Sequence, residues 1–206
     1  MKLYLSSFKF GDNPTQLADL TGENKEVAVI MNAADPYGPA KRPQYLASEL
    51  DSLYRLGLKG HELDLRHYFG NVSGLAQSLG SVGLIWAMGG NAFVLRRAMK
   101  LSGFDHIVPD LVRQNKVVYG GFSAGAVVAG SSLRGIDLVD NPDVQVEGYD
   151  NAPAWDGMNL VPWVLVPHYK SDHPESQAID STVAYLNREH IAYKTLSDGD
   201  VLMVNT

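Results

Sequence analysis

Short apolar runs alternate along the chain with longer segments whose apolar residues recur every three or four positions. Several of the short runs are apolar throughout, as expected of strands buried on both faces of a parallel sheet. The alternation of such runs with helix-like segments predicts an α/β fold with a doubly wound, mostly parallel sheet flanked by helices. The predicted strands span 2–7, 26–34, 61–66, 82–88, 116–121, 163–168, 192–196 and 201–205.

Two of the intervening segments carry clear helix signals. Residues 43–57 place apolar side chains at helical spacing and end on a glycine. In residues 91–103, Asn91 can cap the start of a helix and Gly103 can terminate it. Residues 131–161 are instead rich in turn sequences and weakly periodic, which predicts an irregular excursion that narrows a cleft at the edge of the sheet.

Composition narrows the class of protein. A chain of 206 residues with 45% hydrophobic residues suits one α/β domain spanning 1–206. The absence of cysteine excludes disulfides, thiolate metal sites and a cysteine nucleophile. The net charge is −6 and the basic residues are scattered, so we expect no nucleic-acid partner.

No apolar run approaches the length of a membrane span or a secretory leader, so we expect a cytoplasmic protein with no membrane partner. The oligomeric state stays open, and a homodimer is compatible with the sequence.

The strongest chemical signal is the G-x-S-x-G motif at 121–125, between a predicted strand and a helix. In a nucleophile elbow the serine lies on a strained turn, and the residues two before and two after it must be small. Ser123 is therefore a candidate nucleophile. The Ala124 N–H, at the start of the helix, is a candidate oxyanion donor, and Gly89 and Gly90 offer further donors after the 82–88 strand. A phosphate-binding loop is disfavoured, because the Gly-Lys-Ser/Thr sequence that it needs is absent.

Among six histidines, His168 directly follows a long apolar strand, which places it at the edge where doubly wound sheets collect their active sites. It is our candidate general base, with His173 in the following loop as the substitute. The orienting acid is open at this point. Asp198 follows the histidine in a turn between the last two predicted strands, whereas Asp137 and Asp140 lie between serine and histidine.

Together these motifs resemble the peptidase E (aspartyl dipeptidase) family of serine peptidases, which is related to cyanophycinases and, more distantly, to the class I glutamine amidotransferase-like fold. The resemblance is carried by GGN at 89–91, GFSAGA at 121–126, VPHY at 166–169 and LSDGD at 196–200. It implies a three-layer sandwich, with Ser123 as nucleophile, His168 as base and the N–H groups of Gly90 and Ala124 as oxyanion hole. The glutamate that completes the family's triad falls on Asp198, one methylene shorter, with Asp137 as its rival.

The resulting hypothesis is a dipeptidase or exopeptidase that hydrolyses short peptides through an acyl-enzyme, with no cofactor and no metal. Asn91 and Lys170 are the candidate substrate contacts. Peptidase E-like enzymes that cut after an N-terminal aspartate use arginines just beyond the histidine, whereas here only Lys170 precedes Arg188, so we do not expect a strict aspartate preference.

Two other hypotheses remain. An α/β-hydrolase esterase would order its triad as serine, acid and histidine, and would pair Asp137, Asp140 or Asp172 with His173 or His190. A catalytically silent homologue would keep the pocket only to bind a small ligand.

Overall fold

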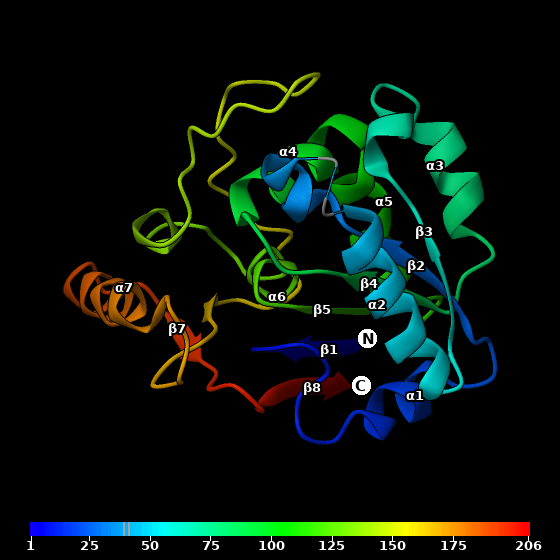
Figure 1. The fold of residues 1–206 in the computed structure, drawn as a ribbon, viewed down its shortest axis with the longest axis horizontal. Helices are drawn as coiled ribbons and strands as arrows, with labels where there is room; N and C mark the ends of the chain where they lie inside the picture. The colour runs from blue at the N-terminus through cyan, green and yellow to red at the C-terminus, as the bar shows by residue number, and fades with distance from the viewer. Residues whose placement is uncertain (39, 41) are drawn as a thin grey trace.

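The computed structural model describes residues 1–38, 40 and 42–206, and a six-stranded sheet forms the centre of the fold (Figure 1). The strand order is β3-β2-β4-β5-β1-β8. Every neighbouring pair is parallel except β1 and β8, so the prediction of a mostly parallel sheet is confirmed. The bounds are β1 Lys2–Ser6, β2 Glu26–Ile30, β3 Lys59–Glu62, β4 Leu84–Ala87, β5 Val118–Phe122 and β8 Val201–Asn205.

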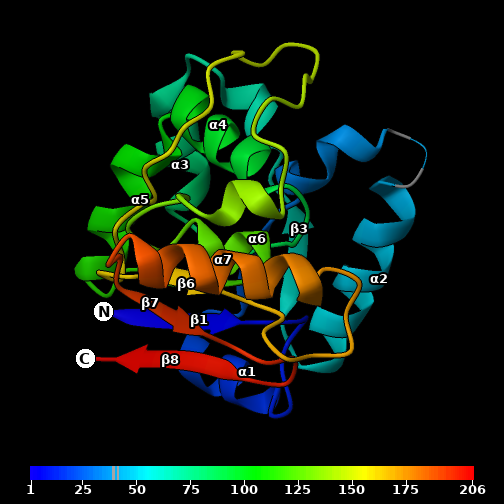
Figure 2. The same ribbon diagram turned by 90° about the vertical axis from the view of Figure 1, so that its left-hand side faces the viewer.

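Helices cover both faces of this sheet, because alternate strand residues enter two separate hydrophobic cores. On one face, α1 (Thr15–Thr21) and α2 (Arg42–Arg55) pack against Trp86 and its neighbours. On the other face lie α3 (Val72–Leu79), α4 (Ala92–Ser102), α5 (Phe104–Arg113) and the short α6 (Ala124–Val127). The result is the predicted three-layer α/β arrangement, with the two chain ends side by side where β1 pairs with β8 (Figures 1 and 2).

Two predicted strands do not join the central sheet. β6 (Val164–Val166) and β7 (Tyr193–Thr195) form a separate parallel pair, with α7 (Ser176–Arg188) between them in sequence. β6 follows α6 in the chain and packs against both α6 and α7. Its backbone pairs with β7. α7 and β7 lie together on the left flank of the molecule in Figure 1.

The predicted strand 26–34 ends at Ile30, because Asn32–Tyr37 forms a 3₁₀ helix (η1) that includes Pro36. The predicted strand 61–66 is displaced to β3, since the Asp64 side chain accepts the N–H of Arg66 and starts a second 3₁₀ helix (η2), Leu65–Tyr68.

Other local predictions are confirmed. Asn91 caps α4 by accepting the Val94 N–H at 3.0 Å, and Gly103 ends the helix in the left-handed conformation. Residues 131–161 are irregular apart from one turn of 3₁₀ helix (η3), Ile136–Leu138. In the described ranges, none of the helices combines the length and the apolar character needed to cross a membrane.

Candidate active site

Three neighbouring strands of the central sheet bring their carboxyl ends to one edge. Because β4, β5 and β1 are adjacent and parallel, Gly89, Ser123 and Ser7 follow strands that end side by side. The Ser123 N–H donates to the carbonyls of Ser6 and Ser7, at 3.2 and 3.1 Å, and so ties the end of β5 to the end of β1. Segments far apart in sequence thus meet around one serine.

The turn at Ser123 is sharp and tightly packed. Ser123 has φ 50° and ψ −118°, a conformation that costs free energy for any residue with a side chain. A Cβ on Gly121 would lie 2.7 Å from the carbonyl oxygen of Ala87, and one on Gly125 only 2.0 Å from it. Both positions therefore require glycine for β4, β5 and α6 to approach each other, which is the packing that the motif predicts.

Unpaired backbone donors surround this serine. Gly89 and Gly90 line the same cavity as Ser123, and Gly90 has φ 138°. Within the described residues, the N–H groups of Gly90 and Ala124 donate to no acceptor. Since α6 has only four residues, its summed dipole is small, and these individual N–H groups supply the local positive potential instead.

His168 is held by a hydrogen bond to Asp198. The two residues are joined by a 2.7 Å contact between His168 Nδ1 and Asp198 Oδ1, and the histidine is only 2% exposed. Ser7 completes the arrangement: its hydroxyl donates to Asp198 Oδ1 at 2.8 Å and accepts the backbone N–H of His168 at 2.7 Å. The sequence analysis missed Ser7, because its part depends on which strands are neighbours.

The shorter side chain of Asp198 reaches the histidine because two loops are bound together. The Tyr169 N–H donates to the carbonyl of Leu196 at 3.1 Å, and the Ser197 hydroxyl donates to the carbonyl of Tyr169 at 2.8 Å. The Asp198 N–H in turn donates to the Ser171 hydroxyl at 2.8 Å. These contacts draw the turn after β7 against the segment that follows β6.

Burial lowers the pKa of His168, the hydrogen bond with Asp198 opposes this effect, and the net pKa lies below the ordinary value of 6.5. The imidazole is therefore neutral at pH 7. With Nδ1 engaged by Asp198, Nε2 is the nitrogen that can accept a proton.

Ser123 and His168 line one cavity of about 530 Å³. Its walls come from the segment after β1, η1, α2, the ends of β4 and β5, and the loop after β6. No described residue of 131–161 lines this cavity, but Ile136, Val139 and Asp140 line a smaller pocket that shares Ser123 and Glu175 with it, so the excursion lies beside the site as predicted. The missed lining residues are Phe8, Lys9, Met31, Ala34, Tyr37, Tyr45, Ser48, Glu49, Met88, Phe122 and Glu175. Phe8 directly follows the predicted strand 2–7 and Met88 ends the predicted strand 82–88, which is the signal that could have identified them.

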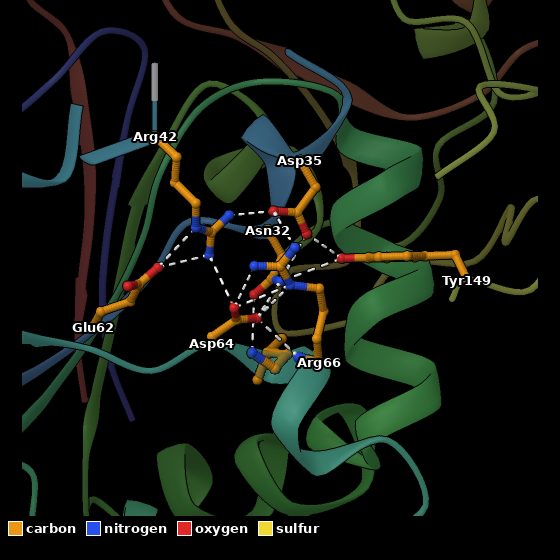
Figure 3. Close-up of polar contacts among 8 residues, drawn as sticks. Asn32, Asp35, Arg42, Glu62, Asp64, Arg66 and Tyr149 are labelled. Atoms are coloured by element: carbon orange, nitrogen blue, oxygen red, sulfur yellow. Dashed lines mark hydrogen bonds and ion pairs between the residues drawn. The ribbon is translucent and has the colours of Figure 1, made fainter. Parts of the chain in front are cut away.

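A buried polar cluster fixes η1 beside this cavity (Figure 3). The Asp35 side chain is 1% exposed and pairs with Arg42 at the start of α2. It also accepts hydrogen bonds from Tyr149 and, at 2.9 Å, from the amide of Asn32. Because Ala34 and Tyr37 of η1 line the cavity, the cluster sets the position of that wall.

His173, the substitute base, stacks on His168 with ring centroids 3.8 Å apart and an interplanar angle of 7°. His168, His173 and Glu175 present ligand atoms within 4.8 Å of one another, a group that could hold a metal ion. In this stacked arrangement, however, the in-plane lone pairs of the two imidazoles lie in parallel planes. One ion could bind both rings only after one of them rotates.

Among the described residues, the rival acids Asp137 and Asp140 accept hydrogen bonds from backbone N–H groups rather than from His168, although Asp140 lines a small pocket together with Ser123. Asp137 accepts the N–H of Gly135 at 2.9 Å, within its own turn. Asp140 accepts the Ala92 N–H at 2.8 Å, and burial raises its pKa to about 7. Over the described ranges, no ion pair joins the acids of the esterase hypothesis (Asp137, Asp140 and Asp172) to its histidines (His173 and His190).

The two predicted substrate contacts are engaged outside the cavity. Asn91 is 6% exposed, caps α4 and donates from its amide to the carbonyl of Asn141 at 3.0 Å. Lys170 is exposed, with its Nζ 5.2 Å from the centre of the Tyr169 ring. Neither side chain lines the cavity, and both assignments stay predictions.

Comparison with solved structures shows the same fold. The chain superimposes on a crystal structure of a Listeria monocytogenes EGD-e protein assigned as a peptidase E, with a TM-score of 0.74, 23% identity, and coverage of 100% of this chain and 98% of that one. A peptidase from an acI-B1 Actinobacterium gives a TM-score of 0.72 at 16% identity, over 99% of this chain and 83% of that one.

Sequence relatives agree with this result. "Uncharacterized peptidase Lin0382" of Listeria innocua is 31% identical over 127 residues, which are 62% of this chain and 57% of that protein. "Uncharacterized peptidase Lmo0363" of Listeria monocytogenes is 29% identical over 127 residues, 62% of this chain and 58% of that protein. The match therefore spans less than two thirds of the length of either relative. The model of peptidase family S51 matches residues 6–206, and the chain thus belongs to this family, the peptidase E family of serine peptidases.

Proposed function

We propose that the protein is a serine peptidase that hydrolyses short peptides through Ser123, His168 and Asp198. The observation that carries the proposal is the 2.7 Å contact between His168 Nδ1 and Asp198, which leaves the other imidazole nitrogen free in the cavity that Ser123 lines. A serine on a strained turn, a neutral buried imidazole and a carboxylate that orients it are the parts of a nucleophilic triad. The motif at 121–125 is then a nucleophile elbow.

In the proposed reaction, Ser123 Oγ attacks the peptide carbonyl while His168 Nε2 accepts the hydroxyl proton. The negative charge that develops on the carbonyl oxygen is stabilised by the N–H groups of Gly90 and Ala124, with Gly89 beside them. The imidazolium then gives its proton to the departing amine as the C–N bond breaks and an acyl-enzyme forms. Water, deprotonated by His168, attacks the ester, and the proton returns to Ser123 as the acid product leaves.

Asp198 is proposed to hold the imidazole in the tautomer with the proton on Nδ1 and to stabilise the imidazolium. Two contacts support this role: the Ser7 hydroxyl donates to the carboxylate and orients it, and the backbone N–H of Asp198 donates to Ser171 and holds the residue in place. The pairing of β1 with β8 supports treating 1–206 as one catalytic domain.

The shape of the cavity favours short substrates. α2 and η1 supply one wall, with Tyr37 and Tyr45, and a volume of about 530 Å³ suits a small ligand rather than a long chain. We therefore infer dipeptidase or short exopeptidase activity rather than digestion of intact proteins.

A fluorophosphonate probe tests the nucleophile. We expect it to label the wild-type protein and the control Ser81→Ala, whose serine is exposed and lies before β4, but not Ser123→Ala. Dipeptide hydrolysis should follow the same pattern. Labelling that persists in Ser123→Ala would exclude Ser123 as the nucleophile. Digestion of a folded protein as fast as of dipeptides would contradict the proposed substrate class.

A further inference from the structure

A buried carboxylate of α2 opens into the cavity at some distance from Ser123. Glu49 is only 5% exposed, and its Oε1 accepts a hydrogen bond from the Trp86 indole N–H at 2.6 Å. Among the described residues, nothing donates to its other oxygen, which is still accessible from the cavity that Glu49 lines. One carboxylate oxygen is thus bound to the protein, and the other is available to a ligand.

Among the described residues, no cation forms an ion pair with this carboxylate, and the charge of Lys9 acts on it only at longer range, so that burial still raises the pKa of Glu49. Burying a carboxylate is costly unless it is paired, and the indole N–H is a neutral partner. Lys9 lines the cavity, but it is exposed and its Nζ lies 5.6 Å from the centre of the Phe8 ring. It makes no ion pair with Glu49 in the part of the chain that the structure describes. Since Glu175 also lines the cavity, the described residues of its walls carry two carboxylates against one lysine.

The walls near Glu49 suit the aliphatic part of a long side chain. Met31, Met88 and Phe122 line the cavity, and the Phe122 ring packs against Trp86 with centroids 6.1 Å apart. Contacts thus run from the Glu49 carboxylate to Trp86 and on to Phe122, the residue before Ser123 in the chain. Methylene groups pack well on such surfaces while a cationic end reaches a polar group beyond them.

We propose that Glu49 binds the ammonium or guanidinium group of a lysine or arginine side chain on the acyl side of the cleaved bond. The protein would then prefer short peptides with a basic residue at that position, and would disfavour aspartate because its carboxylate would face Glu49 and Glu175. This inference rests on the proposed peptidase activity.

The amino group of the substrate backbone is a poorer occupant for this site. It is bonded to the carbon next to the scissile carbonyl, so it stays close to Ser123. Glu49, by contrast, contacts Trp86, whose ring packs on that of Phe122, and only Phe122 is next to Ser123 in the chain. A side chain with several methylenes can span this separation, whereas the backbone amino group cannot.

The test compares substrates that differ only in charge. Lysyl-leucine and norleucyl-leucine have similar aliphatic stems, and only the first carries an ammonium group. For the wild-type protein we expect kcat/KM to favour lysyl-leucine by about 10- to 100-fold, the range of a hydrogen bond to a charged group. In Glu49→Gln, which keeps an oxygen for the Trp86 N–H, this ratio should fall to near 1.

Asp51→Asn is the matched control, because Asp51 lies on the same helix with its side chain 56% exposed and paired with Arg55. It should keep the wild-type ratio. A ratio that is unchanged in Glu49→Gln, or a wild-type preference for norleucyl or aspartyl peptides, would overturn the proposal. An equal loss for both substrates in Glu49→Gln would also overturn it, since that result would mean that Glu49 binds a group common to all peptides.

Binding measurements separate this inference from the proposed function. Calorimetry with Ser123→Ala measures the affinity for both dipeptides without turnover. Tighter binding of lysyl-leucine that depends on Glu49 would support the site even if the wild-type protein hydrolysed no peptide. Equal binding of the two dipeptides would refute the site even if hydrolysis required Ser123.

Discussion

Replacing Asp198 with asparagine tests the proposed triad most directly. The amide has nearly the shape of the carboxylate and can still accept the hydroxyl proton of Ser7, so the fold should be retained. It loses the negative charge whichever way the amide faces. If its NH₂ group takes the place of Oδ1, which contacts both Ser7 and His168 Nδ1, it also gives up the Ser7 proton and favours the wrong imidazole tautomer. In both orientations the charge that stabilises the imidazolium in the proposed triad is removed.

The expected loss follows from the geometry. The equivalent substitution in a fully buried triad lowers kcat by about 10⁴. Here the Asp198 side chain is 25% exposed, so water replaces part of the lost stabilisation. We therefore expect a fall in kcat of about 10³, which corresponds to about 4 kcal/mol of activation free energy.

The assay is steady-state hydrolysis of a fluorogenic dipeptide, with a thermal melt to show that the variant is folded. Asp137→Asn is the control, because that carboxylate contacts only the Gly135 N–H of its own turn among the described residues. It should keep kcat within about twofold, since its hydrogen bond is remote from His168. The assignment of the acid would be wrong if Asp198→Asn retained a third or more of the activity. It would also be wrong if Asp137→Asn lost as much activity as Asp198→Asn.

Three further predictions concern pH and stability. Because burial lowers the pKa of His168, activity should rise with pH, with a midpoint below 6.5, and Asp198→Asn should move that midpoint lower still. A midpoint above 6.5 in a pH–rate profile would contradict the assignment of His168 as the base. In urea denaturation, Gly125→Ala should lower the free energy of unfolding by about 3 kcal/mol or more, since its methyl group would lie 2.0 Å from the Ala87 carbonyl oxygen. The control Gly80→Ala, whose nearest contact is 3.4 Å, should change the free energy of unfolding by less than about 0.5 kcal/mol. Asp35→Ala should destabilise the protein by about 2 kcal/mol, because the Asn32 amide and the Tyr149 hydroxyl lose a buried acceptor while Arg42 keeps its contacts with Glu62 and Asp64. A change in melting temperature too small to detect would show that the cluster in Figure 3 contributes little.

The local features of this protein follow from its sequence. Alternating apolar runs predict the layered α/β fold, and the small residues around Ser123 predict a tight turn that the Ala87 contacts explain. The caps at Asn91 and Gly103 are equally local. His168 could be singled out because it directly follows a strand. All these signals lie within a few residues of the feature that they specify, so neighbouring side chains and backbone preferences are sufficient to determine them.

The tertiary structure decided which distant segments meet. Sequence left Asp198 and Asp137 as rivals, and only the packing of the loops after β6 and β7 brings Asp198 to His168. Nothing in the sequence indicated the part of Ser7, because its contacts require β1 to lie next to β5. Glu49 reads in sequence as one more charged residue on an amphipathic helix, and it is buried beside the cavity because α2 packs over Trp86. Strand order and helix docking depend on the whole hydrophobic core, which no single stretch of the chain encodes.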